Sequence, residues 1–272
     1  DIPKKSASSL VGKFCAVVFS PQHLSLVKEG PSNRRNFIDG SLCQSKPAYA
    51  KLLMNYNRTL SQRNMLLKEI TKHPELKDTL EIWDEKLVKF GVSIIKERFS
   101  YLERLQPIVE EIYHGISSQK EHFSLKYDSS FLKEGQTEIE ACFFEKLRAS
   151  RRSDFMVGYT TVGPHRDDIS FYINEISARS FGSQGQQRSV ALALKLAESK
   201  VMESITGDKP VMFLDDVMSE LDENRQDYIL NHLKDQQVFI TCCDPNTIHQ
   251  LKQGALFKIY QGELIEQMIL KS

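Results

Sequence analysis

The sequence predicts an α/β protein with a parallel sheet in its second half and an inserted, mainly helical domain in its first half. Two strand-length apolar runs, Val211–Leu214 and Gln237–Thr241, are separated by a helical pattern. This alternation is typical of parallel strands joined by crossover helices. In contrast, apolar residues recur at three- and four-residue steps over residues 47–115, which indicates long amphipathic helices.

Composition restricts the class of protein. The 272 residues carry 36 Lys and Arg and 36 Asp and Glu, so the formal charge is zero and any nucleic-acid surface must be local. The five cysteines are irregularly spaced and form no CxxC pair, which favours a reducing, cytoplasmic compartment. No apolar run approaches the roughly 18 residues of a membrane span, so no membrane partner is expected.

The N-terminal part predicts a buried strand at Cys15–Phe19, ended by Pro21 because proline cannot donate to a strand ladder. A turn rich in Gly, Pro and Ser follows. We expect Ser32 or Asn33 to cap the helix after it.

Two amphipathic stretches predict a helical hairpin, or arm. The first begins near Pro47 and breaks near Pro74, and the second runs from about Asp78 into the Gly115 region. We expect Pro107 to kink or divide the second helix. An ordinary helical subdomain is favoured over a long coiled coil, because the stretch holds too few heptads.

The segments around the arm and after it alternate between strand and helix patterns. Strands are expected at residues 122–127 and 169–173, a helix at 137–152, an extended segment at 156–161 and a hairpin return at 176–181. The C-terminal part adds a helix at 224–233, the strand at 237–241, a short helix at 246–251 and a closing hairpin that turns at 261–262.

The stretch from Phe181 to Asp222 carries the chemistry. A Gly/Ser/Gln loop opens a helix at Ser183, and a helix start with exposed amides binds phosphate oxygens. Gly182 and Gly185 let the backbone approach a ligand closely. The alternative is an ordinary Ser cap after a Gly turn.

Two carboxylates, Asp215 and Asp216, follow the strand Val211–Leu214. In a nucleotide site Asp215 would hold Mg²⁺, and Asp216 would orient or deprotonate the attacking water. Alone, the pair fits two solvated acids at a strand end equally well. The preceding loop and helix, with Ser-Glu-Leu-Asp directly downstream, favour the nucleotide site.

At this point SQGQQRSVALALKLAE and VMFLDDVMSELD closely resemble the signature motif, Walker B strand and D-loop of the RecF family, DNA-repair ATPases of the ABC and SMC class. GPHRDD at 163–168 and the segments at 17–39 and 56–64 also look like motifs of that family. The resemblance covers essentially the whole chain. It implies an ABC-type ATPase lobe, with the helical arm inserted.

The resemblance also implies site residues. ATP and Mg²⁺ would be bound between the two subunits of an ATP-dependent homodimer, with Ser183 and the amides near Gly185 on the γ-phosphate of the partner's ATP. Asp215 would serve Mg²⁺ and Asp216 the hydrolytic water. The other positions that the family pattern assigns to the nucleotide are Gln22, Gln184, Gln186, Asp222 and Cys243.

Two of these assignments are less direct. Gln22 falls where the class has its Q-loop, and Ser20 and His23 compete for that role. Cys243 stands at the switch position, often His in ABC ATPases, and cysteine cannot hold the γ-phosphate as that His does.

The phosphate-binding motif of the class, GxxxxGK[ST], does not occur in the sequence, since Gly12-Lys13 is followed by Phe14. We expect a fragment, about three quarters of a family protein, rather than a divergent member. The full-length protein would be a slow ATPase. This chain alone is expected neither to bind ATP nor to hydrolyse it.

The predicted domains are residues 1–39, the end of a first ATPase segment, residues 40–135, the helical arm, and residues 136–272, the C-terminal ATPase lobe. The resemblance implies a recombination mediator that clamps duplex DNA next to single-stranded gaps and works with a RecR-type partner to load the strand-exchange protein. Two alternatives stay open: a DNA-binding and dimerisation module without catalysis, and a transporter-type ABC subunit, against which the arm and GPHRDD argue.

Three basic clusters are candidates for DNA phosphate contacts. Each fits a solvated helix face or an internal ion pair as well. The clusters are Arg34 with Arg35, Arg58 with Arg63, and Arg148 with Arg151 and Arg152.

Overall fold

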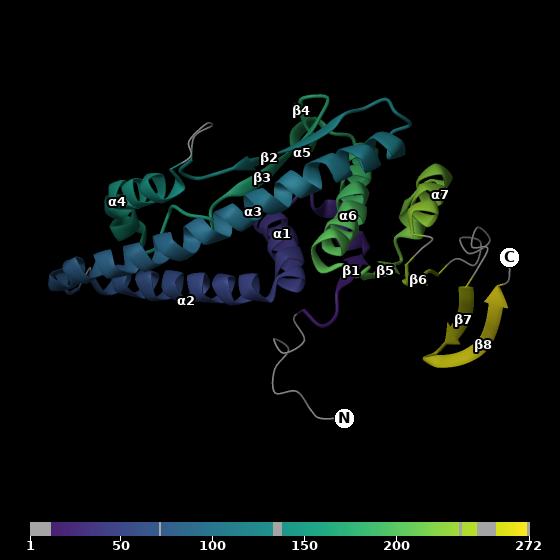
Figure 1. The fold of residues 1–272 in the computed structure, drawn as a ribbon, viewed down its shortest axis with the longest axis horizontal. Coiled ribbons are helices and arrows are strands. Elements are labelled where there is room, and N and C mark those ends of the chain that lie inside the picture. The colour runs from purple at the N-terminus through teal and green to yellow at the C-terminus, as the bar shows by residue number, and fades with distance from the viewer. Residues whose placement is uncertain (1–11, 71, 133–137, 234–235, 244–253, 271–272) are drawn as a thin grey trace.

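A three-stranded parallel sheet of order β1-β5-β6 forms the α/β part of the molecule (Figure 1). The computed structural model describes residues 12–70, 72–132, 138–233, 236–243 and 254–270. The strands are β1 (Ala16–Phe19), β5 (Val211–Asp215) and β6 (Val238–Thr241). The predicted parallel sheet is therefore confirmed, and it brings the two apolar runs of the second half side by side.

Helix α6 (Gln184–Thr206) covers one face of this sheet and is the most deeply buried helix of the second half. Val17 and Leu214, which point toward the core, are each 1% exposed. On the other sheet face Val18 and Phe239 are 44% and 48% exposed. Because α6 also packs against α3, its middle is buried on all sides, including the ion pair between Lys195 and Glu198.

Helix α1 (Pro31–Ser45) begins two or three residues earlier than the capping pattern suggests. Gly30 is the N-cap, and Pro31 occupies the first helical position. Proline suits that position, because its fixed φ is helical and its missing N–H is not needed there. The prediction that Ser32 or Asn33 caps this helix is therefore wrong.

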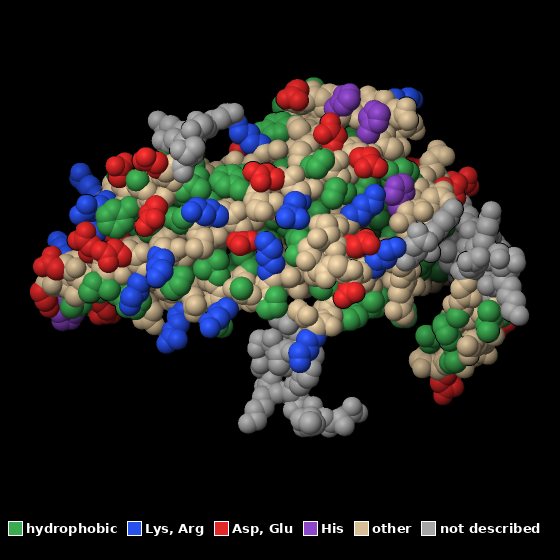
Figure 2. Space-filling view, in the orientation of Figure 1, with side chains coloured by type: hydrophobic (Ala, Val, Ile, Leu, Met, Phe, Trp, Pro, Cys, Tyr) green, Lys and Arg blue, Asp and Glu red, His purple; other side chains and the backbone are tan. Residues whose placement is uncertain are grey.

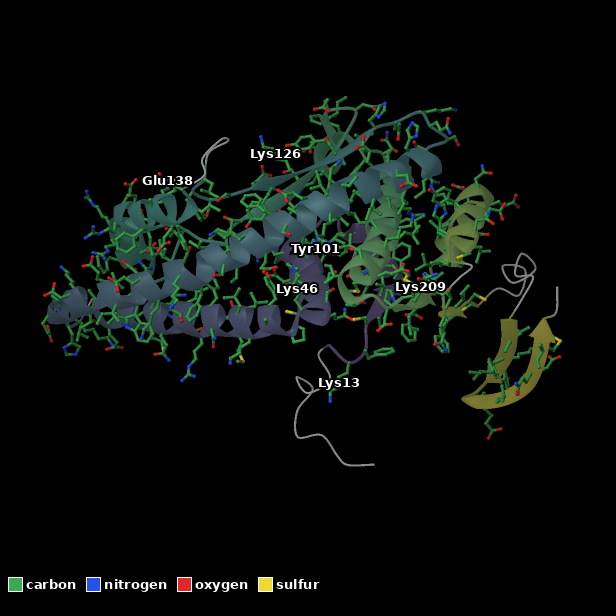
Figure 3. All side chains as sticks on the ribbon, in the orientation of Figure 1. Lys13, Lys46, Tyr101, Lys126, Glu138 and Lys209 are labelled. Atoms are coloured by element: carbon green, nitrogen blue, oxygen red, sulfur yellow. The ribbon has the colours of Figure 1, made fainter. Side chains whose placement is uncertain are left out.

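The predicted arm is a hairpin of α2 (Pro47–Ile70) and α3 (Leu80–Ile116), joined through η3 (Pro74–Thr79) (Figure 1). Helix α3 continues through Pro107, so it is not divided there. Tyr101 lies between α3 and α1 (Figure 3), and its hydroxyl donates to Ser41 Oγ at 2.9 Å. Direct packing thus connects the arm to the rest of the chain.

A second, antiparallel sheet lies along α3. It contains β2 (Phe123–Asp128), β3 (Asp168–Ile173) and the short β4 (Ile176–Ser177). The predicted hairpin return at 176–181 is therefore only partly strand, since Ala178–Phe181 forms the helical turn α5. The extended segment predicted at 156–161 is wrong at its start, because α4 (Ile139–Val157) continues to Val157.

The C-terminal part follows its predicted order. After η4 (Met218–Glu220) come α7 (Glu223–His232) and the hairpin of β7 (Gly254–Tyr260) and β8 (Glu263–Leu270). Gln261 and Gly262 form the hairpin turn, both with positive φ. The helix predicted at 246–251 lies outside the described residues.

One apolar core runs from the parallel sheet to α4, and pairing between strands crosses the predicted boundary at residue 135, because β2 pairs with β3. The division into three domains therefore stays a prediction. Among the described helices, none is long and apolar enough to cross a membrane.

Candidate functional site

The start of α6 is an exposed group of hydrogen-bond donors. Ser183 is the N-cap, and its Oγ accepts from the Gln186 backbone N–H at 3.2 Å while Gln186 Oε1 accepts from the Ser183 N–H at 2.8 Å. Within the described part of the chain, the N–H groups of Gln184 and Gly185 find no acceptor. A 23-residue helix with free amides at its start attracts an anion.

This loop is fixed to the C-terminal end of the long arm helix. Gln186 Nε2 donates to Glu121 Oε1 at 2.7 Å, and Tyr113 of α3 donates its hydroxyl to Glu121 Oε2 at 2.6 Å. Burial, and secondly the bond to Glu121, raise the pKa of Tyr113, so the phenol remains a donor. The sequence analysis did not single out Glu121.

Arg225 holds the candidate D-loop, which ends at Asp222, against the same loop. Arg225 lies in none of the motifs named in the sequence analysis. Asp222 caps α7 and contacts the Arg225 guanidinium. Arg225 Nε donates to Ser189 Oγ at 3.0 Å, and its Nη2 donates to the Gly185 carbonyl at 3.4 Å. The signal available in the sequence was a cation three residues after a helix-capping aspartate.

Asp215 and Asp216 lie at the carboxyl end of β5, and both are organised by Thr241 of the neighbouring strand β6. Thr241 Oγ1 donates to Asp215 Oδ1 at 2.7 Å. The Asp216 N–H donates to the Thr241 carbonyl and hydroxyl, each at 3.1 Å. Parallel pairing places Thr241 directly opposite Asp215, so the strand end is preorganised.

Asp216 has an unusual backbone, with φ at +51°. This left-handed conformation costs a non-glycine residue roughly 1 kcal/mol or more, although Asp and Asn tolerate it best. Ser219 supports it by donating its hydroxyl to the Asp216 carbonyl at 3.1 Å. Asp216 therefore lies just beyond the carboxyl end of β5, which is where ligands of α/β proteins bind.

These residues fit one side of a Mg-nucleotide site. The described residues contain no group of three or more His, Cys, Asp or Glu side chains that could hold a metal alone. Mg²⁺ in nucleotide sites takes one or two carboxylates and completes its shell with water and phosphate oxygens. Asp215, which is exposed and keeps its second oxygen free of protein donors among the described contacts, matches that chemistry.

The Q-loop candidates are separated by their contacts. His23 Nδ1 lies 2.9 Å from Ser20 Oγ, and burial, then Lys195, lower the pKa of His23. Ser20 and His23 are therefore hydrogen-bonded to each other. Gln22 is exposed in η2 (Pro21–Ser25), and its side chain makes no hydrogen bond within the described ranges, so its role stays a prediction.

Cys243 is exposed just after β6, and its switch role is also untested.

Arg63 is at the centre of a buried ionic network that joins three helices. Its Nε lies 2.6 Å from Asp84 Oδ1 of α3, and its Nη1 lies 2.7 Å from Asp154 Oδ2 of α4. All three side chains are 0% exposed. Arg151 pairs with the other oxygen of Asp84 at 2.7 Å. The prediction that Arg63 contacts DNA is wrong, because its charge is buried and neutralised internally.

Arg34 is corrected in the same way. It is 2% exposed and makes a two-pronged ion pair with Asp168, with N–O distances of 2.7 and 2.8 Å. Asp168, the second Asp of the GPHRDD segment, thus binds α1. Arg166 of the same segment is exposed and lies over the Tyr159 ring. Arg34 has no free donor face for DNA phosphate.

The remaining arginine candidates differ in availability. Arg148 is exposed but pairs with Glu81 at 3.0 Å, and Arg151 is occupied by Asp84. Arg35 is half-buried and donates to the Asp167 carbonyl at 2.6 Å. Arg58 and Arg152 are exposed without an ion pair among the described residues. DNA contact by these five side chains stays a prediction.

Comparison with known proteins places this geometry in context. No family model matches the sequence. The DNA replication and repair protein RecF of Ruminiclostridium cellulolyticum is 42% identical over 269 residues, which cover 97% of this chain and 72% of the relative. RecF of Clostridium tetani is 43% identical over 263 residues, covering 95% and 71%. The solved recombination mediator protein RecF-ATP in the RecFOR pathway has a TM-score of 0.87 at 40% identity, over 97% of this chain and 70% of that one.

Proposed function

Because this chain belongs to the RecF family of DNA replication and repair proteins, we propose that it forms the signature-bearing part of an ATP-dependent, dimerising DNA-repair ATPase. One observation carries the proposal above the others. The same chain presents a Ser-capped helix start with free amides and, through Arg225, a D-loop fixed beside it. These are the groups that a second subunit's nucleotide would meet in the ABC-type fold.

The chemistry follows from the residues. Bound Mg²⁺ would neutralise charge on the phosphates. Asp215 offers it a carboxylate oxygen, Asp216 accepts the proton of the attacking water, and Ser183 donates its hydroxyl to the γ-phosphate of the partner's ATP. Asp222 and Arg225 keep the signature loop and D-loop in register, so closure of the dimer would bring both to the nucleotide together.

The proposed biological role is that of a recombination mediator. The family's solved members are described with ATP and in the RecFOR pathway, which supports ATP as ligand and a RecR-type protein as partner. In this role an ATP-dependent homodimer clamps duplex DNA next to a single-stranded gap and helps load the strand-exchange protein. Slow hydrolysis then resets the clamp.

Substitution Ser183→Arg should abolish ATP-driven dimerisation of the full-length gene product while leaving nucleotide binding within about threefold of wild type. The bulky cation would occupy the space in front of the free amides, where the partner's γ-phosphate belongs. Light scattering with and without ATP measures the dimer, and a fluorescent nucleotide measures binding. Ser180→Arg, on the preceding exposed turn, is the control, and dimers of Ser183→Arg in ATP would exclude the trans-signature arrangement.

Substitution Thr241→Val should raise the Mg²⁺ concentration needed for half-maximal ATP turnover by about 10- to 100-fold. Valine keeps the strand and the side-chain volume but removes the hydroxyl that orients Asp215 and supports Asp216. A Mg²⁺ titration of turnover by the full-length gene product gives the result. Thr206→Val, at the end of α6, is the matched control, and an unchanged Mg²⁺ midpoint for Thr241→Val would remove this threonine from the site.

A non-catalytic DNA-binding and dimerisation role is supported by one observation, the lack of a GxxxxGK[ST] motif in the sequence. Measuring ATP turnover by the full-length gene product, with the purified 272-residue chain alongside it, separates the two roles. No turnover is expected from the chain alone, whereas the full-length gene product should hydrolyse ATP slowly. Absence of turnover in both would establish the non-catalytic role.

A further inference from the structure

The solvent face of α2 is a basic ridge, which we define as Lys51, Met54, Arg58, Ser61, Met65 and Lys68. All six side chains are exposed. They follow the helix at three- and four-residue steps, opposite the buried residues Tyr49, Tyr56, Arg63 and Ile70. Figure 2 shows Lys and Arg side chains projecting along the edge of the molecule that α2 occupies in Figure 1.

The charge of this ridge is not balanced locally. Lys51, Arg58 and Lys68 form no ion pair with any described residue, and Glu69 is the only acidic residue of α2. The exposed face of α3 differs, because Lys86, Lys89 and Lys96 lie there among Glu85, Glu97 and Glu103. In a chain of zero net charge, an unpaired row of three cations on one helix creates a local positive potential.

The spacing of the three cations suits a regular polyanion. At 1.5 Å per residue, they extend along roughly 25 Å of straight helix. A DNA strand presents one phosphate for about every 3.4 Å of duplex axis, so each long side chain has a phosphate within reach. The ridge holds no aromatic side chain, which single-strand-binding surfaces use to stack bases. These features favour the backbone of duplex DNA, recognised without base contacts.

A cleft flanks the ridge, and part of its lining offers more donors. It has a volume of about 410 Å³ and is lined in part by Arg35 and Asn36 of α1 and by Asn57, the neighbour of Arg58. The side chains of Asn36 and Asn57 make no hydrogen bond within the described part of the chain. Arg35 donates one N–H to the Asp167 carbonyl. Such neutral and cationic donors beside a basic ridge are typical of phosphate contacts.

We propose that the α2 ridge, with the cleft at its flank, binds the phosphate backbone of duplex DNA. This inference rests on the proposed DNA-binding function and adds the surface that performs it. The arm would then connect the DNA surface to the candidate nucleotide site. DNA would lie along α2, and α3, which packs against α2, continues to the Tyr113–Glu121 contact that fixes the signature loop.

The test is the salt dependence of DNA binding by the purified chain. Anisotropy of a labelled duplex of about 30 base pairs gives the affinity between about 50 and 200 mM NaCl. The variant Lys51→Gln/Arg58→Gln/Lys68→Gln should bind at least about tenfold more weakly at about 0.1 M salt, and its log-affinity against log-salt slope should fall by about 2.7. Glutamine preserves helix propensity, so the melting temperature should not change.

The matched control is Lys86→Gln/Lys89→Gln/Lys96→Gln on α3, which removes the same charge. Its slope should change by less than about 1. Equal losses in both variants, or normal duplex binding by the ridge variant, would overturn the inference while leaving the proposed DNA-binding function intact. If the wild-type chain bound no duplex even at low salt, the DNA-binding function itself would fail. A ridge variant that bound duplex normally but lost binding to polyglutamate would assign the ridge to an acidic protein.

Discussion

Asp216→Asn should reduce ATP turnover by the full-length gene product by about 100- to 10,000-fold, the usual contribution of a positioned general base. ATP-driven dimerisation should persist, because the amide has the shape of the carboxylate and only its capacity to accept a proton is lost. The local structure should also survive. Asparagine tolerates the left-handed backbone, and its Oδ1 still accepts from the Ser219 hydroxyl, 3.4 Å away.

The control for this experiment is Asp208→Asn, an exposed aspartate in the connection between α6 and β5. It makes the same chemical change in the same part of the chain and should leave turnover unchanged. Turnover is measured by phosphate release, and dimers by light scattering in ATP. If Asp216→Asn hydrolysed ATP within about threefold of wild type, Asp216 would have no catalytic role, and another group would have to orient the water.

The second large effect is on stability. Arg63→Met should lower the free energy of unfolding by about 3–5 kcal/mol, because it leaves buried carboxylates without their cation. Asp84 retains Arg151, so most of the penalty should fall on Asp154, which keeps only the Thr161 donors at 2.9 and 2.7 Å. Urea unfolding of the purified chain at neutral pH measures the difference.

The matched control is Arg58→Met, the same change on the exposed face of the same helix, which should shift stability by no more than about 0.5 kcal/mol. A second variant isolates the cause. Adding Asp154→Asn to Arg63→Met removes the uncompensated charge and should recover at least about 1 kcal/mol of the loss. A loss below about 1 kcal/mol for Arg63→Met, or no recovery in the double variant, would contradict the ionic explanation.

The burial of Arg63 is consistent with a pattern that is visible in the sequence. Tyr49, Tyr56, Arg63 and Ile70 recur every seven residues and form the buried face of α2. A cation at the apolar position of an amphipathic helix is more consistent with a buried ion pair than with a DNA contact. Arg58, five residues earlier, falls on the opposite face, so the pair Arg58–Arg63 was never one cluster.

Elements with local signals were predictable from the amino-acid pattern alone. The apolar runs predicted β5 and β6, three- and four-residue periodicity predicted α2 and α3, and the Ser-Gln-Gly loop predicted the start of α6. Each signal depends on residues within one or two turns of helix or one strand, where propensity, capping and periodicity act. The resemblance to the RecF family rested on the same contiguous motifs.

Contacts between groups far apart in the chain could not be predicted in this way and are seen only in the folded structure. Arg63 pairs with Asp154, 91 residues away, and Thr241 reaches back to Asp215 across the parallel sheet. Arg225 joins the D-loop to Gly185, and Glu121 joins the arm to Gln186. This is because a periodic pattern fixes which face of an element is buried but does not fix which element packs against it. Partners are chosen by packing, and a buried charge is stable only where packing supplies its counter-charge.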